Sequence, residues 1–261
     1  MMIRKSIIWI LPVYLSLVST VSMGDIPKHF AMFSSGYHLH VADSLYFHKD
    51  YHGALASYQE AKEKSPIPLT GAPLFKMAYA AYMTGNYTEA GAFFHQLYSK
   101  QKYLPVFSSY FHIKSQWPVD SEKAVRQATD FTIAHDRHFL SDSLILAIAD
   151  HLYEHRAYNQ AREFYLKAIR RNLDKVRTVE HKIRAAHCLY NTGRERLARD
   201  EDYQIIKKYE GKEQTLKLAQ WLQQKETGFA TEHFFSIADV YFANREYTAL
   251  SKLLEDFTKN E

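Results

Sequence analysis

Cysteine, glycine and proline are all scarce in this sequence of 261 residues. Cys188 is the only cysteine, so an intrachain disulfide cannot form. Its place between His187 and Leu189 in a predicted helix favours a thiol packed in the core, the alternative being a reactive or intermolecular thiol. The sequence has nine glycines and seven prolines, but 19 tyrosines and 16 phenylalanines. This composition is typical of long helices joined by short turns.

A large excess of one charge is also missing. The chain has 33 basic and 29 acidic side chains, a formal net charge of +4. Removal of the first 24 residues takes away Arg4 and Lys5 and leaves 31 basic residues against 29 acidic ones. So small a surplus gives no electrostatic basis for binding nucleic acid or an anionic membrane.

Catalytic motifs are absent from the sequence. It has no Gly-x-Ser-x-Gly, no glycine-rich phosphate loop and no plausible Cys/His pairing. Fourteen histidines include four close pairs, namely His38/His40, His48/His52, His135/His138 and His151/His155. A zinc site needs three or four convergent ligands, and the i, i+4 pairs lack the glutamate of a His-Glu-x-x-His motif, so solvated helix or turn positions are predicted. We therefore predict no enzyme activity, no cofactor and no metal, with a His-dependent metal-binding protein as an alternative.

The first 24 residues have the pattern of an export signal. Arg4 and Lys5 precede the 12-residue apolar stretch Ile7–Val18, and Ser22-Met23-Gly24 supplies small residues for cleavage. Twelve helical residues reach roughly 18 Å, which is less than the ~30 Å hydrocarbon core. Cleavage after Gly24 is predicted, giving a periplasmic or secreted chain without an integral membrane span. An uncleaved N-terminal anchor is the alternative.

What the sequence does contain is a recurring pattern of small and aromatic residues. The pattern Ala-x3-Tyr or Ala-x3-Phe occurs at Ala54, Ala90 and Ala161, and related alanines stand at 124 and 198. These five alanines are 36, 34, 37 and 37 residues apart. Self-similarity at such a period indicates a stack of repeated supersecondary units.

The clearest unit runs from Ser35 to Pro66. A first helix with Ala42 precedes a turn at Lys49-Asp50, and a second helix carries Ala54 and Tyr58. Small residues allow two helices to approach closely, and the aromatic residue fills the remaining space. Further turns are predicted at Gly85-Asn86, Ala157-Tyr158, Thr192-Gly193 and Glu246-Tyr247. The third unit is the weakest, because His112 replaces the small residue and Trp117-Pro118 ends its first helix.

This layout resembles the tetratricopeptide repeat (TPR) family, whose pattern is W-x2-L-G-x2-Y, then A-x3-F, then P. The resemblance covers about Ser35 to Phe257, although no unit has the family's tryptophan and its glycine is replaced by Ala42, Ala78, Ala149, Ala186 and Ala238. It implies an all-α, TPR-like α-solenoid, a right-handed superhelix of antiparallel helix pairs. We predict a signal peptide at 1–24, a lead-in at 25–34 and a repeat domain of about six units at 35–261. An extra helix near 212–226 is interpreted as a degenerate repeat, or alternatively as an inserted helix.

The resemblance also implies that the first helices of the pairs line a concave groove. The aromatic residues predicted there to bind a partner are Tyr46, Phe75, Tyr79, Tyr82, Trp117, Tyr153, Tyr190 and Phe242, with Phe47 and Phe235 beside them. Rigid amphipathic rings suit the binding of a protein or peptide. The alternative is that these rings pack against the next repeat. We thus predict an exported, protein- or peptide-binding scaffold of the cell envelope, or alternatively a non-catalytic relative or accessory of cell-wall lytic enzymes.

Overall fold

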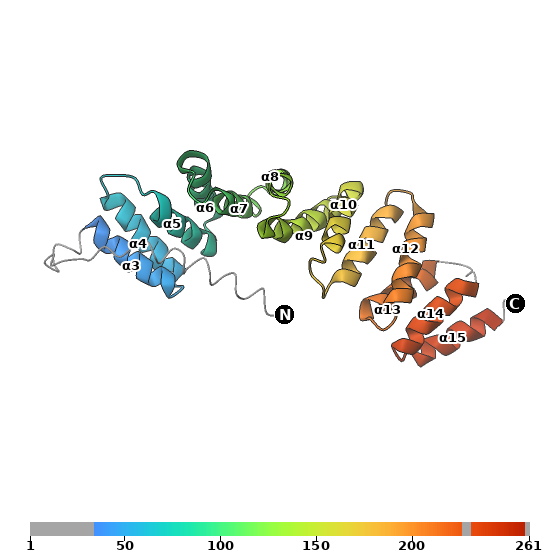
Figure 1. Ribbon diagram of the computed structural model, residues 1–261. Coiled ribbons are helices and arrows are strands. Elements are labelled where there is room, and N and C mark those ends of the chain that lie inside the picture. The colour runs from blue at the N-terminus through green and yellow to red at the C-terminus, as the bar shows by residue number, and fades with distance from the viewer. Residues whose placement is uncertain (1–33, 226–230, 259–261) are drawn as a thin grey trace. The chain divides into compact units, whose positions relative to one another are not determined.

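The computed structural model describes residues 34–225 and 231–258, apart from the side chain of Glu232. Within these ranges every regular element is a helix and there is no strand (Figure 1). The predicted signal peptide and all but the last residue of the lead-in lie outside the described residues. None of the described helices is long and apolar enough to cross a bilayer. The all-α fold class predicted from the sequence is confirmed.

The chain divides into two compact units, with the boundary in the sequence between Ala128 and Thr129, inside helix α8 (Ser121–Ala134). The helices of the first unit that precede α8 are α3 (Ser35–Phe47), α4 (Tyr51–Lys64), α5 (Gly71–Met83), α6 (Tyr87–Gln96), the π-helix η1 (Leu97–Gln101) and α7 (Pro105–Gln116). Those of the second unit that follow α8 are α9 (Phe139–Glu154), α10 (Tyr158–Arg170), α11 (Thr178–Tyr190), α12 (Glu195–Lys208), α13 (Glu213–Lys225), α14 (Thr231–Ala243) and α15 (Tyr247–Thr258).

Helices that are consecutive in the sequence pack against each other within each unit. In the first unit α3 packs on α4, α4 on α5, and α5 on α6. In the second, α9 packs on α10, α10 on α11, and α11 on α12. Short turns make the partners of a pair antiparallel. Each unit therefore has the helix-pair stacking of a TPR-like α-solenoid.

The alanines of the repeat pattern are buried in the core between helices. Ala54, Ala90 and Ala161 have no exposed surface. The aromatic side chains one helical turn further on, Tyr58, Phe94 and Tyr165, are also fully buried. The interpretation of the pattern as an interhelical packing motif is confirmed.

The turns of five helix pairs share one backbone conformation. The residue two positions before the second helix has a positive φ in each, namely Lys49 (63°), Gly85 (83°), Arg156 (61°), Gly193 (75°) and Arg245 (62°). Left-handed backbone costs a non-glycine residue roughly 1–2 kcal/mol. The repeat geometry thus imposes this conformation even where the sequence supplies lysine or arginine. These five turns are the ones predicted from the sequence.

The irregular parts of the array are also integrated into the core. Helix α7 ends at Gln116, as Trp117-Pro118 predicted, and His112 is buried with its Nδ1 donating to the Gly91 carbonyl at 2.9 Å. The extra helix α13 packs against α11, α12 and α14 and buries Leu218 and Leu222. Cys188 is buried in the second unit, so the prediction of a packed core thiol is confirmed.

Candidate partner-binding faces

Two of the aromatic residues predicted to face a groove belong to the core of the first unit. Phe75 is fully buried and contacts Phe94 and Phe111 at ring-centroid distances of 5.5 and 6.2 Å. Tyr46 is also buried and lies 6.0 Å from Tyr79. The prediction that Phe75 and Tyr46 contact a partner is therefore wrong. Both rings fill space between helices, which was the alternative reading of the aromatic pattern.

Tyr79 and Tyr82 on α5 form a half-buried aromatic cluster in the same unit. Tyr79 lies 5.2 Å and Tyr82 5.8 Å from Phe111 of α7, measured between ring centroids. Burial, followed by the neighbouring tyrosines, raises the pKa of Tyr79 to about 12. Its hydroxyl group consequently stays protonated near neutral pH and can donate a hydrogen bond. Trp117 is half-buried at the C-terminal end of α7.

In the second unit Tyr190 belongs to a cluster that the sequence pattern did not reveal. Its ring centroid is 5.2 Å from that of Trp221 on α13, and the Lys225 ammonium lies 3.9 Å from the Tyr190 centroid and 4.8 Å from that of Trp221. The ring centroid of His187 lies 5.1 Å from that of Trp221, and its Nε2 atom is buried and without a hydrogen-bond partner. Burial and then Lys225 lower the pKa of His187, which keeps the ring neutral. We call these four residues the Tyr190 cluster.

Tyr153 on α9 is half-buried beside a charged group. The guanidinium carbon of Arg184 lies 6.0 Å from the Tyr153 ring centroid. Arg184 also donates to Asp150 at 2.7 Å and pairs with Glu180 at 2.9 Å. About a third of the Arg184 side chain is exposed (35 %), so this cation is within reach of a partner.

The first unit contains an equivalent ion pair whose cation is buried. Lys76 donates to Asp43 at 2.9 Å and lies 5.4 Å from the Phe47 ring centroid, but only 3 % of its side chain is exposed. Lys76 follows Asp43 by 33 residues, and Arg184 follows Asp150 by 34. That spacing matches the repeat period and is the signal from which both ion pairs could have been predicted.

Phe242 and Phe235 are exposed side chains one heptad apart on α14. Phe242 is 65 % exposed and contacts Tyr247 of α15 at 6.3 Å between ring centroids. Both residues are thus exposed at the surface, and their contact with a partner remains a prediction. Phe242 shares no ring contact with the Tyr190 cluster among the interactions described.

The paired histidines have local structural contacts. His138 caps α9, its Nδ1 atom accepting a hydrogen bond from the Leu140 amide at 3.2 Å. His155 donates from Nδ1 to the His151 carbonyl at 2.9 Å, and the two rings stack 3.9 Å apart. In the described ranges no three His, Cys, Asp or Glu side chains converge as metal ligands would. The absence of a metal remains a prediction for the chain as a whole.

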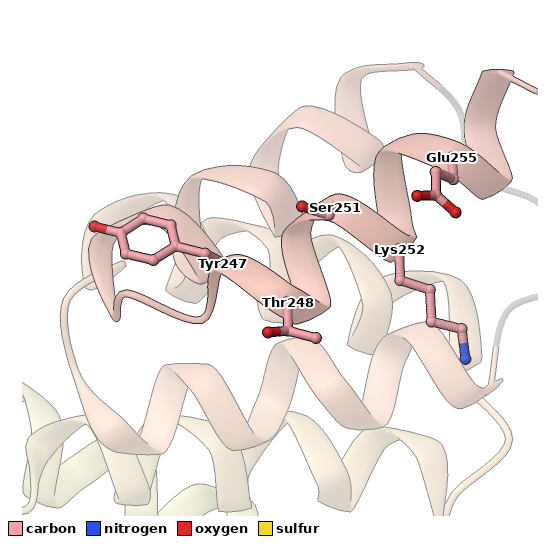
Figure 2. Close-up of a pocket in the computed structure, with 5 residues that line it drawn as sticks. All are labelled: Tyr247, Thr248, Ser251, Lys252 and Glu255. Atoms are coloured by element: carbon pink, nitrogen blue, oxygen red, sulfur yellow. The ribbon is translucent and has the colours of Figure 1, made fainter.

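A surface hollow on the last helix does not form a cleft between elements. Figure 2 shows its five lining residues, which all lie on α15, namely Tyr247, Thr248, Ser251, Lys252 and Glu255. Their spacing places them on one face of a single helix. Four of the five are polar or charged, as expected of a solvated outer face in a stacked array. We assign no site to this surface.

Comparison with known proteins finds similarity only among solved structures. No protein-family model matches the chain, and no curated protein matches it. The crystal structure of the MamA protein aligns with a TM-score of 0.48 and 11% identity over 75% of this chain and 97% of that one. The Rap conjugation gene regulator of plasmid pLS20, solved in complex with the Phr* peptide, aligns with a TM-score of 0.38 and 16% identity over 93% and 75% of the two chains. The P58(IPK) TPR domain gives 0.34 and 14% over 87% and 66%.

Proposed function

We propose that this chain is a non-catalytic scaffold that binds a protein or peptide partner through the first helices of its repeats. The observation that carries the proposal is the Tyr190 cluster, where aromatic rings from α11 and α13 meet beneath a solvent-facing cation. In the first unit Tyr79 and Tyr82 give a second half-exposed aromatic surface.

Such surfaces have the composition of protein-binding sites. Tyrosine and tryptophan offer a large contact area, lose few rotamers on binding, and present one polar atom each. A partner that covers Tyr153 would also meet the exposed part of Arg184, which can donate to its backbone carbonyls or carboxylates. An extended or helical peptide segment can satisfy both kinds of contact.

Partner capture by aromatic variants tests this function. We expect that changing Tyr82, Tyr153 and Tyr190 together to alanine abolishes capture of a partner that the unaltered chain retains from an envelope extract. Each anchor could contribute roughly 2 kcal/mol to binding. The matched control changes His151 and His155 to alanine, and capture should persist.

Because the three tyrosines are half-buried, circular dichroism and the melting temperature must show that the triple variant still folds. A second variant, Lys225→Gln, alters the exposed part of the Tyr190 cluster without removing a ring. Unchanged capture by both folded variants, or capture that depends on the two histidines and on a metal ion, would overturn the proposal.

We further propose that this scaffold acts in the cell envelope after export. The support is the predicted signal sequence, with Arg4-Lys5, the apolar stretch Ile7–Val18 and the cleavage site ending at Gly24. N-terminal sequencing of protein from its native host should return Asp25 as the first residue. An intact N-terminus in the membrane fraction would indicate the uncleaved anchor, whereas an intact N-terminus in the cytosol would refute export.

A further inference from the structure

A groove of about 320 Å³ lies between helices α10 and α12 of the second unit. Leu166 and Ile169 of α10 line one side, and Ile205 of α12 lines the other. Lys182 and Ala185 of α11 also line the groove, as do Glu201, Gln204 and Lys208 of α12 and Tyr209 directly after it. The lining is therefore mixed, with an aliphatic part from Leu166, Ile169, Ala185 and Ile205, and is formed by three consecutive helices of one unit.

The only carboxylate that lines the groove is already neutralised. Arg162 of α10 donates to the two carboxylate oxygens of Glu201 of α12, at 2.5 and 3.1 Å. The same guanidinium donates to the Ala185 carbonyl at 3.0 Å. This three-way contact ties α10, α11 and α12 together. It also removes Glu201 as a strong attraction for a cationic ligand.

Two further cations of the lining have no acidic partner. The ammonium groups of Lys182 and Lys208 lie 5.5 and 5.8 Å from the ring centroid of Tyr209. Neither makes an ion pair within the described part of the chain. Both ammonium groups lie beside the same ring, so their positive potentials add there and favour an anion. The groove thus combines an apolar wall with an unneutralised positive end.

We propose that this groove binds a carboxylate that carries a short aliphatic body. The carboxylate would lie between Lys182 and Lys208, and the aliphatic part would cover Leu166, Ile169 and Ile205. The volume is at the lower end of the range for small-molecule pockets, which suits a ligand of about ten non-hydrogen atoms. Both a free medium-chain carboxylate and a Glu-Leu segment of a peptide have this chemistry. The site shares no residue with the proposed partner-binding clusters, so its test is independent of theirs.

Amide chemical shifts of the full chain, labelled with ¹⁵N, can detect binding in the groove. Octanoate probes the free carboxylate, acetyl-Glu-Leu-amide probes the peptide source, and octanamide is the neutral counterpart of octanoate. We expect saturable shifts of the Ala185 and Tyr209 amides with octanoate, the peptide or both, and at most weak shifts with octanamide. Whichever carboxylate binds more tightly identifies the source. Affinity should fall as salt is raised, because the contact is between charges near the surface.

Matched lysine variants decide whether the two cations are responsible. The double variant Lys182→Gln/Lys208→Gln should lower the affinity for the carboxylate by about tenfold or more. Lys207→Gln removes one charge from α12 at a position that does not line the groove, so it is matched to the single variant Lys208→Gln, and it should change the affinity less than twofold. Thermal melting of each variant shows whether it has folded.

Three results would overturn the proposal. The first is the absence of a saturable shift with either carboxylate, and the second is equal binding of octanoate and octanamide. The third is an equal loss of affinity in Lys207→Gln and Lys208→Gln, which each remove one charge from α12, because it would show that only the overall charge matters. If the double variant does not fold, the two single variants, Lys182→Gln and Lys208→Gln, are compared with Lys207→Gln in the same way. None of these results bears on partner capture through the Tyr190 cluster.

Discussion

The Tyr165 hydroxyl group donates a hydrogen bond to the Asp150 carboxylate at 2.7 Å, which joins α10 to α9. Arg184 of α11 donates to the same carboxylate at 2.7 Å and so ties the next helix pair to this one. In the first unit Tyr58 and Lys76 make the equivalent contacts to Asp43. Each acid follows the small alanine of its repeat and is 15 residues from its tyrosine. A polar network therefore accompanies the packing motif at the same register in both units.

Replacing Tyr165 by phenylalanine should destabilise the chain by about 1 kcal/mol, measured as the free energy of unfolding in urea. A hydrogen bond to a charged group contributes roughly 1.5–3 kcal/mol, and partial exposure of Asp150 reduces that value. Tyr158→Phe is the control, because the described contact of Tyr158 is its ring packing on Tyr153. Equal stability of the two variants would show that the Tyr165 hydrogen bond contributes nothing net.

Enlarging Ala90 or Ala161 to leucine should lower the free energy of unfolding by about 1–3 kcal/mol, because both residues are fully buried between helices. Ala92→Leu serves as the control, since Ala92 is exposed on the same helix as Ala90. The melting temperature of the Ala92 variant should stay close to that of the unaltered chain. Melting temperatures that remain unchanged for both buried sites would contradict the helix–helix register.

The turn residues should respond to substitution with opposite signs. Gly85→Ala is expected to destabilise by about 1–2 kcal/mol, because φ is 83° there and alanine is strained in this region. Arg156→Gly should be neutral or stabilising by up to about 1 kcal/mol, because relief of the strain at φ 61° offsets the entropy cost of glycine. Gly36 has no neighbouring atom within 4 Å and lies in a helix, so Gly36→Ala should stabilise. Destabilisation in all three variants would refute the explanation that the backbone φ of each position decides the sign of the effect.

Cys188 should resist thiol reagents while the chain is folded. Burial raises its pKa to about 11, so the thiol is protonated at pH 8 and also shielded. We expect labelling only at the rate of unfolding and rapid labelling in denaturant.

Because the unfolded thiol ionises near its ordinary pKa of about 8.5 and the folded one does not, the stability should decrease between roughly pH 9 and 11. Cys188→Ala should lose this alkaline decrease, and rapid labelling of the folded chain would show that the thiol is accessible.

Much of the fold could be predicted from the sequence because its determinants are local. The alanine and aromatic positions predicted the helix pairs, and the five turns were placed correctly from residues within a few positions of each. Trp117-Pro118 predicted the end of α7 by the same reasoning, since proline removes a backbone donor and disfavours helix before it. The extra helix was predicted at 212–226 and is α13, Glu213–Lys225.

The candidate site could be predicted only in part, because neighbouring positions on one helix can face in different directions. Phe75 and Tyr79 are one helical turn apart, yet Phe75 is fully buried and Tyr79 is partly exposed. The difference depends on which helices lie next to α5 and how closely they approach each side chain. A repeat pattern does not specify how closely a neighbouring helix approaches each side chain. The sequence pattern also left out Trp221, because it belongs to the helix that departs from the repeat period.

The sequence by itself thus determined the helices, their turns and the small-to-large packing within each pair, all of which depend on residues close together in the chain. Only the tertiary structure decided which side chains from different pairs meet. The Lys225 ammonium over Tyr190 and the Arg162–Glu201 contact across the groove join residues 35 and 39 positions apart. Such contacts depend on the offset between stacked helices and on the rotamers of long side chains. Periodicity fixes neither quantity.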